Sequence, residues 1–313
     1  MENLSSWHPY WLSFPSELEF SDLDMNVINF IMNCYHSFEG GFGDYLGEKD
    51  SFVNSTVKGI ICLNLLKKMD RIKRIDIYSF LKGCQNSDFG FAITTSKSDL
   101  YPSNLESTFY SIVAINMIGY LPRLKLQQPK IISWVLSHYN LDGGFHAEDS
   151  IISNEYYTFQ ALLALHLLKS LDRIDPNLTV NYLINRQINK NPDITLTTSR
   201  LLALYLLQGP EHLTERLNIK ISTTRLSRCQ NKEGGFRKKK IDLIYSSDML
   251  YTFQGILGLN VIGKSKKINK ERAIEWILSC QNDDGGFGKK PNSNSSLSNT
   301  FHALVALYYL THP

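Results

Sequence analysis

A short stretch that cannot lie inside a helix recurs along this 313-residue chain and constrains its fold more than any other feature. The stretch is two glycines and a phenylalanine, usually preceded by a glutamine and polar residues, as in QNDDGGF at 281–287. Adjacent glycines end a helix, because glycine readily adopts backbone conformations that other residues avoid. The stretch also occurs at 39–42, 142–145 and 230–236, and at 85–91 with one glycine replaced. This spacing indicates repeated units of about 50 residues.

A threonine that opens an apolar run follows each of these turns after a polar stretch. The run predicts a helix, because its apolar residues recur at helical spacing. Most of its remaining positions are small or apolar too, and a helix that is apolar nearly all round is expected to be buried. A weaker example begins near Thr198, after a stretch at 186–189 that keeps the glutamine and lacks the glycines. The clear examples begin at Thr56, Thr108, Thr158, Thr252 and Thr300.

The other half of each unit is amphipathic, as in KINKERAIEWILSCQ at 267–281. Each unit therefore predicts an outer amphipathic helix, a turn and an inner buried helix. Six such hairpins can form an open superhelix or a closed ring, and buried inner helices favour the ring, since each needs neighbours on several sides. We expect an N-terminal segment, residues 1–24, and a single all-α domain of six repeats, residues 25–313.

Composition argues against several classes of protein. The chain has 33 basic and 30 acidic residues, a balance that indicates no nucleic-acid partner. No signal-peptide pattern occurs, and no apolar stretch approaches the roughly 20 residues of a membrane span. We therefore expect a cytoplasmic protein without an integral membrane span. The five cysteines form no CxxC pair and no zinc-finger spacing.

The QxxxGGF turn followed by a threonine-led buried helix resembles the α/α-toroid superfamily. That superfamily includes the β subunits of protein prenyltransferases and the class II terpene and triterpene cyclases. The resemblance covers roughly residues 25–311. It implies an α6-α6 toroid, with inner and outer helices around a central apolar cavity that holds an isoprenoid chain. It also implies an isoprenoid diphosphate as the ligand and suggests a partner subunit.

The resemblance to protein prenyltransferases implies a zinc site made of Asp, Cys and His. The zinc lowers the pKa of the substrate thiol, so that a thiolate attacks the prenyl diphosphate. At the corresponding positions this sequence has Asp248, Leu250 and Asn299. A shifted register that recruits His302 places Asp242 at the aspartate position and still supplies no cysteine. The ligand set is incomplete, so we expect no zinc cofactor, whereas Mg²⁺ is compatible with a diphosphate substrate.

The resemblance to class II cyclases implies a different site, a DxDD stretch before a threonine, whose middle acid protonates an alkene or epoxide. No DxDD occurs here. With the family's threonine placed on Thr108, Glu106 takes the donor position, and Asn104 and Ser107 are expected to orient its proton. Burial beside apolar side chains favours the protonated form that this role needs. The alternative interpretation is that Glu106 is a charge at a helix N-terminus, where the helix dipole favours it.

Two further groups of residues are expected to bind substrate. The basic run after the fourth recognisable turn can pair with phosphate oxygens, although a solvated loop is the alternative, and Lys289 and Lys290 extend it. Aromatic residues at the heads of the inner helices can line a prenyl cavity and stabilise a carbocation, although core packing also explains them. The basic run is Arg237, Lys238, Lys239 and Lys240. The aromatic residues are Tyr156, Tyr157, Tyr251, Phe253 and Phe301.

These observations predict an enzyme that handles an isoprenoid diphosphate without the usual zinc triad, by cyclisation or by a non-standard prenyl transfer. Glu106 and Asp248 are the catalytic candidates. One alternative is a non-catalytic toroid that binds an isoprenoid or a protein after losing the metal site. Another is a zinc-dependent subunit similar to the prenyltransferase β subunits.

Overall fold

The computed structural model describes residues 24–95, 101–186, 193–216, 219–239 and 247–312. Within these residues the chain forms twelve α-helices. In chain order they are α1 (Asp24–Asn33), α2 (Val53–Leu65), α3 (Arg74–Gly83), α4 (Leu105–Met117), α5 (Gln128–Leu136), α6 (Glu155–Leu167), α7 (Pro176–Arg186), α8 (Ile194–Arg216), α9 (Ile219–Ser227), α10 (Met249–Val261), α11 (Lys270–Leu278) and α12 (Leu297–Thr311).

The remaining elements are short. Four 3-10 turns join helices: η3 (Met69–Arg71), η4 (Leu121–Leu124), η5 (Leu171–Arg173) and η6 (Ser265–Lys267). Two antiparallel pairs of two-residue strands flank turns: β1 (Tyr35–His36) with β2 (Gly41–Phe42), and β3 (Phe287–Gly288) with β4 (Ser295–Ser296).

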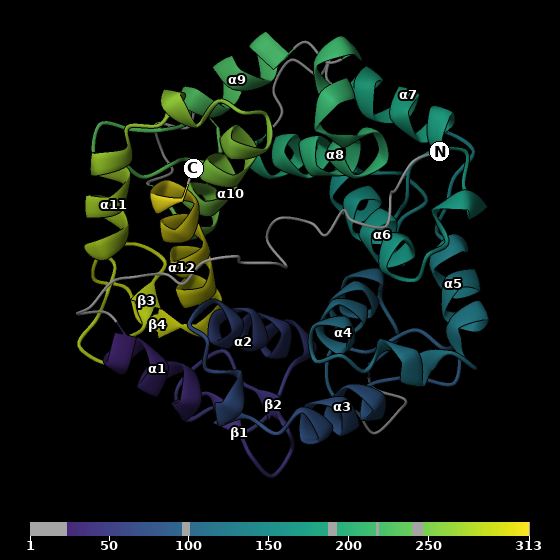
Figure 1. Ribbon diagram of the computed structural model, residues 1–313, viewed down its shortest axis with the longest axis horizontal. Helices are drawn as coiled ribbons and strands as arrows, with labels where there is room; N and C mark the ends of the chain where they lie inside the picture. The colour runs from purple at the N-terminus through teal and green to yellow at the C-terminus, as the bar shows by residue number, and fades with distance from the viewer. Residues whose placement is uncertain (1–23, 96–100, 187–192, 217–218, 240–246, 313) are drawn as a thin grey trace.

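The even-numbered helices form an inner ring and the odd-numbered helices surround it (Figure 1). Each inner helix packs against the next one in the chain, and α12 packs against α2. The expected all-α toroid is therefore confirmed, and contacts between its first and last inner helices close it. No helix in the described ranges combines the length and the apolar character needed to cross a membrane.

The inner helices begin with a common hydrogen bond. The backbone N–H of the turn phenylalanine donates to the hydroxyl of the threonine in the first turn of the helix, at 2.9–3.0 Å. The pairs are Phe42–Thr56, Phe91–Thr108, Phe145–Thr158, Phe236–Thr252 and Phe287–Thr300. All five phenylalanines are fully buried. The threonine thus satisfies a buried donor that would otherwise be costly to leave unpaired.

The inner helix α8 departs from this register by one residue. The hydroxyl of Thr197 donates to the backbone carbonyl of Asp193, the N-cap residue of α8. The repeat threonines of α6, α10 and α12 donate in the same way to the N-cap residues of their helices. The equivalent of the repeat threonine is therefore Thr197, one residue before the Thr198 that the sequence indicated. Thr198 donates instead to the carbonyl of Gln254 on α10, at 2.9 Å.

The heads of the inner helices are joined around one rim of the ring. In four helices the first backbone N–H donates to a carbonyl that lies two residues after the turn phenylalanine of the following unit. These bonds are Val53–Ile93, Ile194–Lys238, Met249–Lys289 and Leu297–Asp44, at 2.7–3.0 Å. The last of them connects the end of the domain to its beginning. The helix heads, and the side chains that they carry, therefore share one end of the toroid.

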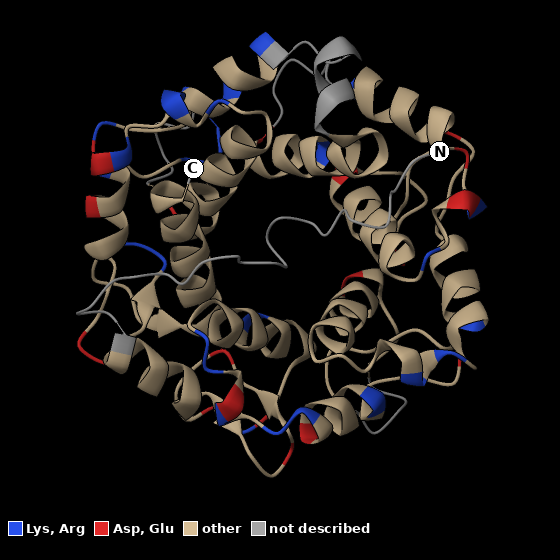
Figure 2. Cartoon of the chain, in the orientation of Figure 1, with Lys and Arg blue, Asp and Glu red and all other residues tan. Residues whose placement is uncertain are grey.

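Charged side chains gather on the outer helices and the connecting loops, and the inner ring is largely without them (Figure 2). The exceptions point to a site, because a charge on a buried helix is stabilised only by specific partners. Along the described inner helices, as far as the kink at Gly209 in α8, they are Lys58, Glu106, Glu155 and Arg200.

Candidate functional site

The four charged residues of the inner ring form two groups. Arg200 and Glu155 are both buried and face each other at 3.8 Å, between α8 and the head of α6. Lys58 on α2 and Glu106 on α4 lie close enough for Glu106 to affect the titration of Lys58. The second group is the one that contains the acid expected from the sequence.

Helix geometry shows which way these side chains point. The repeat threonine faces the turn, which lies outside the inner ring. A residue two positions before or after it is rotated by about 200° around the helix axis. Such residues therefore point toward the axis of the toroid. This axis-facing set includes Lys58, Glu106, Tyr110, Tyr156, Ser298 and His302.

The Glu106 carboxyl group is held by a neighbouring helix. The hydroxyl of Tyr156 on α6 donates to Glu106 Oε1 at 2.7 Å. The pKa of Tyr110 is raised mainly by burial and also by the charge of Glu106. The pKa of Tyr156 is raised mainly by burial and also by Tyr110 and Glu106. Both phenols therefore stay neutral. Asn104, which was expected to orient the proton of Glu106, caps α4 by accepting from the backbone N–H of Ser107 at 2.7 Å.

Lys58 is the residue of this cluster that the sequence analysis missed. Its Nζ donates to Ser298 Oγ at 2.7 Å, and Ser298 Oγ donates in turn to Asp44 Oδ1 at 2.6 Å. Burial lowers the pKa of Lys58, and the carboxylates of Asp44 and Glu106 oppose that shift. The signal in the sequence is a lone lysine inside an otherwise apolar inner helix.

His302 lies on the other side of Lys58, on α12. Its ring stacks on Phe253 of α10, with centroids 5.1 Å apart, and lies 5.2 Å from the ring of Phe301. The side chain is 9% exposed, and its Nδ1 has no hydrogen-bond partner within the described part of the chain. Burial and the nearby Lys58 lower the pKa of His302 well below its usual range, so the imidazole is neutral.

The second catalytic candidate, Asp248, lies on the opposite side of the ring, three inner helices away from α4. It caps α10 by accepting from the Leu250 N–H at 2.9 Å, and its Oδ2 is 3.1 Å from Lys289 Nζ. A hydrogen bond from Lys289 to Asp248 raises the pKa of that lysine. Both side chains are thus already paired with each other.

One residue of the basic run, Lys238, lies on the same side of the ring as Asp248 and Lys289. Lys238 Nζ lies 3.9 Å from Asp193 Oδ2 at the head of α8. Burial raises the pKa of Tyr251. The charge of Lys238 lowers that pKa and the charge of Asp248 raises it. Arg237 and Lys239 are half-buried, and Lys240 lies outside the described residues. The structure thus brings Lys238, Lys289 and Tyr251 together at the heads of α8 and α10. Phosphate binding there stays a prediction.

The expected aromatic residues divide between the two sides of the ring. Tyr156 and Tyr157 lie edge to face at 5.4 Å near Glu106, and Phe253 and Phe301 pair at 5.6 Å beside His302. Tyr157 is half-buried, while Phe253 and Phe301 are each 8% exposed. The two phenylalanines therefore also serve as ordinary core.

Residues 12–195 and 189–312 match the family model of the prenyltransferase alpha-alpha toroid domain. The chain belongs to this family. Both halves of the ring are covered, so the match accounts for the whole described toroid.

Known proteins of two kinds are similar to the chain, the first in sequence and the second in structure. The chain is 22% identical over 286 residues to the geranylgeranyl transferase type-2 subunit beta of Saccharomyces cerevisiae, covering 90% of this chain and 72% of that protein. It is 22% identical over 187 residues to the protein farnesyltransferase subunit beta of Arabidopsis thaliana, but spans only 37% of that protein's length. A solved variant of the type II terpene cyclase MstE from Scytonema, in complex with geranylgeranyl dihydroxybenzoate, superimposes with a TM-score of 0.64 at 13% identity, covering 93% of this chain and 96% of MstE.

The residues at the prenyltransferase zinc positions do not fit a zinc ion. Leu250 offers no ligand atom, and the amide nitrogen of Asn299 donates to Ser296 Oγ at 2.9 Å. Asp248 is paired with Lys289. Across the described ranges, no three His, Cys, Asp or Glu side chains gather in a group that could hold a metal ion.

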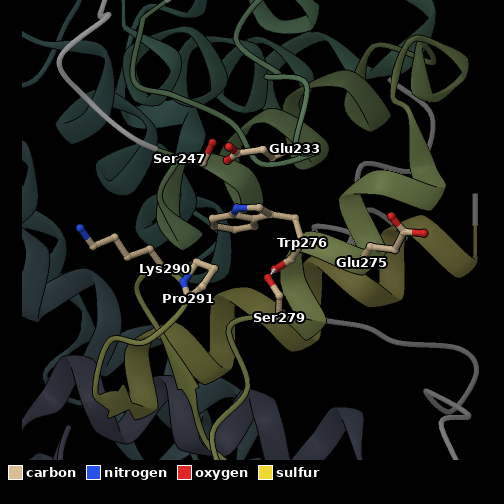
Figure 3. A pocket seen from close by; sticks show the side chains of 7 residues that line it. All are labelled: Glu233, Ser247, Glu275, Trp276, Ser279, Lys290 and Pro291. Carbon is tan, nitrogen blue, oxygen red and sulfur yellow. Dashed lines mark hydrogen bonds between the residues drawn. The ribbon is translucent and has the colours of Figure 1, made fainter.

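A pocket of about 350 Å³ lies on the outside of the ring, beside α11 (Figure 3). The indole of Trp276 sits in its middle, with Glu233 and Ser247 to one side. In three of the equivalent turns a shorter aspartate accepts from a serine that follows the turn, as Asp142 does from Ser153 at 2.8 Å. Glu233 holds the equivalent position here, and both Glu233 and Ser247 line the pocket. This pocket lies away from the axis and shares no residue with the Glu106 cluster.

Proposed function

We propose that this protein is an isoprenoid-handling enzyme that cyclises a polyprenyl chain by protonating an alkene, with Glu106 as the acid. The observation that carries this proposal is the position of the Glu106 carboxyl group. It faces the axis of the toroid, accepts a hydrogen bond from Tyr156 and lies near Lys58.

In the proposed reaction Glu106 starts as the neutral acid, and its surroundings stabilise the carboxylate that proton donation leaves. Tyr156 donates to Oε1 of the Glu106 carboxyl group, and the hydroxyl of Tyr110 also interacts with that group. Negative charge develops on the carboxyl group as the proton leaves. The Tyr156 hydrogen bond stabilises that charge directly, and hydrogen bonds to a charged group are the strong ones. The Lys58 ammonium stabilises it at longer range. Aromatic side chains such as Tyr110 can stabilise the carbocation on the substrate.

The opposite side of the ring supports a binding place for an anionic head group. Lys238, Lys289 and Tyr251 lie there, at the heads of α8 and α10. A prenyl chain with its diphosphate at these residues would lie across the axis, with its far end directed at Glu106. The geranylgeranyl group on the ligand of the MstE neighbour supports a polyprenyl substrate.

The test is the Glu106→Gln variant, which keeps the size of the side chain and removes the acid. Geranylgeranyl diphosphate is the probe, and cyclised products are measured by gas chromatography and mass spectrometry after phosphatase treatment. We expect cyclisation to fall by roughly 100-fold or more, the contribution of a positioned acid. Probe binding, measured as a rise in melting temperature, should persist. Glu271→Gln, at an exposed position of α11, is the matched control and should retain the native rate.

Two outcomes would contradict the proposal. Cyclisation at the native rate by the Glu106→Gln variant would show that Glu106 is a charge at a helix end and no more. Binding of the probe by the native protein without any conversion would favour a non-catalytic toroid.

A second candidate function is that of a subunit similar to the prenyltransferase β subunits, acting with a partner subunit. The curated relatives favour it, since both are β subunits of protein prenyltransferases. The side chains of Leu250 and Asn299 argue against the zinc-dependent form. Metal analysis of the purified protein separates the two, because stoichiometric zinc would overturn our interpretation of these two positions.

A further inference from the structure

The pocket beside α11 is lined by the counterparts of residues that hold an aspartate carboxylate in the second repeat. In that repeat Asp88 Oδ1 accepts from the Gly90 backbone N–H at 3.0 Å and from the Ser103 hydroxyl at 2.8 Å. The other oxygen, Asp88 Oδ2, accepts from Trp134 Nε1 at 3.1 Å. Two N–H groups and one hydroxyl thus converge on one carboxylate, and hydrogen bonds to an ionised acceptor are the strong ones.

The fifth repeat places the same three kinds of donor in the same way. If a Cβ is added to either glycine, it lies 2.6 Å from the serine Cβ and 2.5–2.6 Å from Cε2 of the tryptophan. The two sites therefore have matching geometry. The counterparts of Gly90, Ser103 and Trp134 are Gly235, Ser247 and Trp276.

The carboxylate that would fill this place is absent from the fifth repeat. Glu233 holds the aspartate position, but its longer side chain is exposed, and its Oε2 lies 3.4 Å from Asn231 Nδ2. Among the described residues, the Gly235 N–H, Trp276 Nε1 and the Ser247 hydroxyl hydrogen have no acceptor. A buried indole N–H usually finds a partner, and leaving such a donor unpaired is unfavourable.

These donors are open to a ligand. The Trp276 side chain is 5% exposed, and it lines the pocket together with Ser247. The indole lies in the middle of the pocket, with Ser247 and Glu233 on one side of it (Figure 3). The half-buried Pro291 adds apolar surface to the wall. The volume of about 350 Å³ is at the lower end of the range for small-molecule sites.

We propose that this pocket binds the carboxylate group of a small molecule, with Trp276 Nε1, the Ser247 hydroxyl and the Gly235 N–H as the donors. The apolar body of the ligand lies against the indole. The site is on the outer side of the ring and is independent of the proposed cyclisation.

The charges around the pocket bear on the source of the carboxylate. Glu233 and Glu275 line the pocket, and Lys290 is the cation that lines it with them. A simple carboxylic acid is repelled by the two glutamates, whereas the ammonium group of an α-amino acid is attracted to them. Both sources share the carboxylate, and we expect an apolar amino acid to bind more tightly than the simple acid of the same skeleton.

The experiment follows the indole N–H signals of the full chain, labelled with ¹⁵N, by nuclear magnetic resonance. The chain has four tryptophans, and the Trp276→Phe variant identifies the signal of Trp276. The probes are 3-phenylpropionate and phenylalanine, with the neutral 3-phenylpropanamide as control. Circular dichroism shows whether each variant folds.

We expect both carboxylate probes to move the Trp276 indole proton downfield in a saturable way, with dissociation constants on the order of 1 mM. The neutral amide should bind roughly tenfold more weakly, because it lacks the charge that strengthens these hydrogen bonds. The signal of Trp134 should not move, since its N–H already donates to Asp88.

Two variants at one position sharpen the test. Glu233→Asp restores the shorter carboxylate of the second repeat, so it should occupy the donors, shift the Trp276 signal downfield without any probe and abolish binding. Glu233→Gln keeps the length and removes the charge, so 3-phenylpropionate should bind roughly fivefold more tightly, while phenylalanine gains less. Glu271→Gln, at an exposed position of α11 that does not line the pocket, should behave as the native protein does.

Binding that moves the Trp276 signal and is lost in Glu233→Asp supports the proposal, and the order of the two probes then identifies the source. Absence of a shift with both carboxylate probes, in the native protein and in Glu233→Gln alike, would overturn it. Unchanged binding in Glu233→Asp would overturn it as well, because the carboxylate would then bind elsewhere.

Discussion

Tyr156 and Glu106 occupy the same repeat position on neighbouring inner helices, two residues before the threonine that anchors each helix. Equivalent positions come together because the ring brings the helix heads to one rim, with the side chains two residues from the threonine pointing at the axis. Lys58, Tyr110 and His302 share the other position of this kind, two residues after the threonine. The chemistry of the site thus depends on which side chains the repeat places at two positions.

The hydrogen bond between these two residues gives the first prediction. In Tyr156→Phe the Glu106 carboxylate that forms during proton transfer loses its donor. A hydrogen bond to a charged group contributes about 1.5–3 kcal/mol, which corresponds to a rate of cyclisation lowered by roughly 10–100-fold. Initial rates with geranylgeranyl diphosphate measure it. Tyr157→Phe is the control, and equal losses in both variants would mean that the bond to Glu106 has no special role.

The sequence placed Glu106 in the first turn of its helix because the threonine register fixes that position by simple counting. It did not reveal Lys58 or the bond from Tyr156, because those contacts cross between helices. They depend on the rotation and spacing of neighbouring helices, which no local pattern encodes. Asn104 caps α4 through its Oδ1, and its expected part in orienting the Glu106 proton stays a prediction.

At the scale of the element, the repeating piece is a turn bonded to the helix that follows it. The turn phenylalanine fits against a small residue three positions after the threonine, as Phe42 does against Gly59 and Phe236 against Gly255. In α8 the equivalent position is the fully buried Arg200. This substitution coincides with the unit whose sequence lacks the Gly-Gly-Phe turn, so the space that a phenylalanine fills elsewhere is open to a longer side chain.

This pattern explains why the fold could be predicted while the register of α8 could not. Five units repeat the same turn, bond and helix, so each supports the others and the toroid follows. In the fourth unit no glycine pair marks the start, and the adjacent threonines at 197 and 198 leave two registers open. The cap made by Asp193 decides between them in the structure.

The second prediction concerns the bond between turn and helix. Thr300→Val keeps the shape of the side chain but leaves the buried N–H of Phe287 without an acceptor. An unsatisfied buried donor destabilises a protein by about 1–3 kcal/mol, so the free energy of unfolding in urea should fall by that amount. Thr300→Ser retains the hydroxyl and should lose clearly less stability. A valine variant as stable as the serine variant would show that the bond has little influence.

At the scale of the whole molecule, the ring is closed by contacts between residues far apart in the sequence. Asp44 accepts from the backbone N–H and the hydroxyl of Ser298, at 2.8 and 2.6 Å, and the hydroxyl of Ser298 accepts from Lys58 at 2.7 Å. The closure therefore passes through the polar cluster itself. The last turn also packs outward onto the first helix, since Gly285 lies against the backbone of Asn26 in α1. Closure and the geometry of the site are consequently linked.

The last prediction tests that closure through a glycine. Gly285 has φ of +87°, and a Cβ added there would overlap the backbone carbonyl of Asn26, whereas Gly263 has φ of +64° and open space around it. Replacing either by alanine forces a side chain into a left-handed conformation, which costs roughly 1–2 kcal/mol. Only Gly285→Ala must also push the last turn away from α1. Urea unfolding should therefore show a larger loss of stability for Gly285→Ala than for Gly263→Ala, and hydrogen exchange should become faster in α1 for the first variant alone. Equal losses, with exchange in α1 unchanged, would show that the outer contact between the chain's two ends does not hold the ring together.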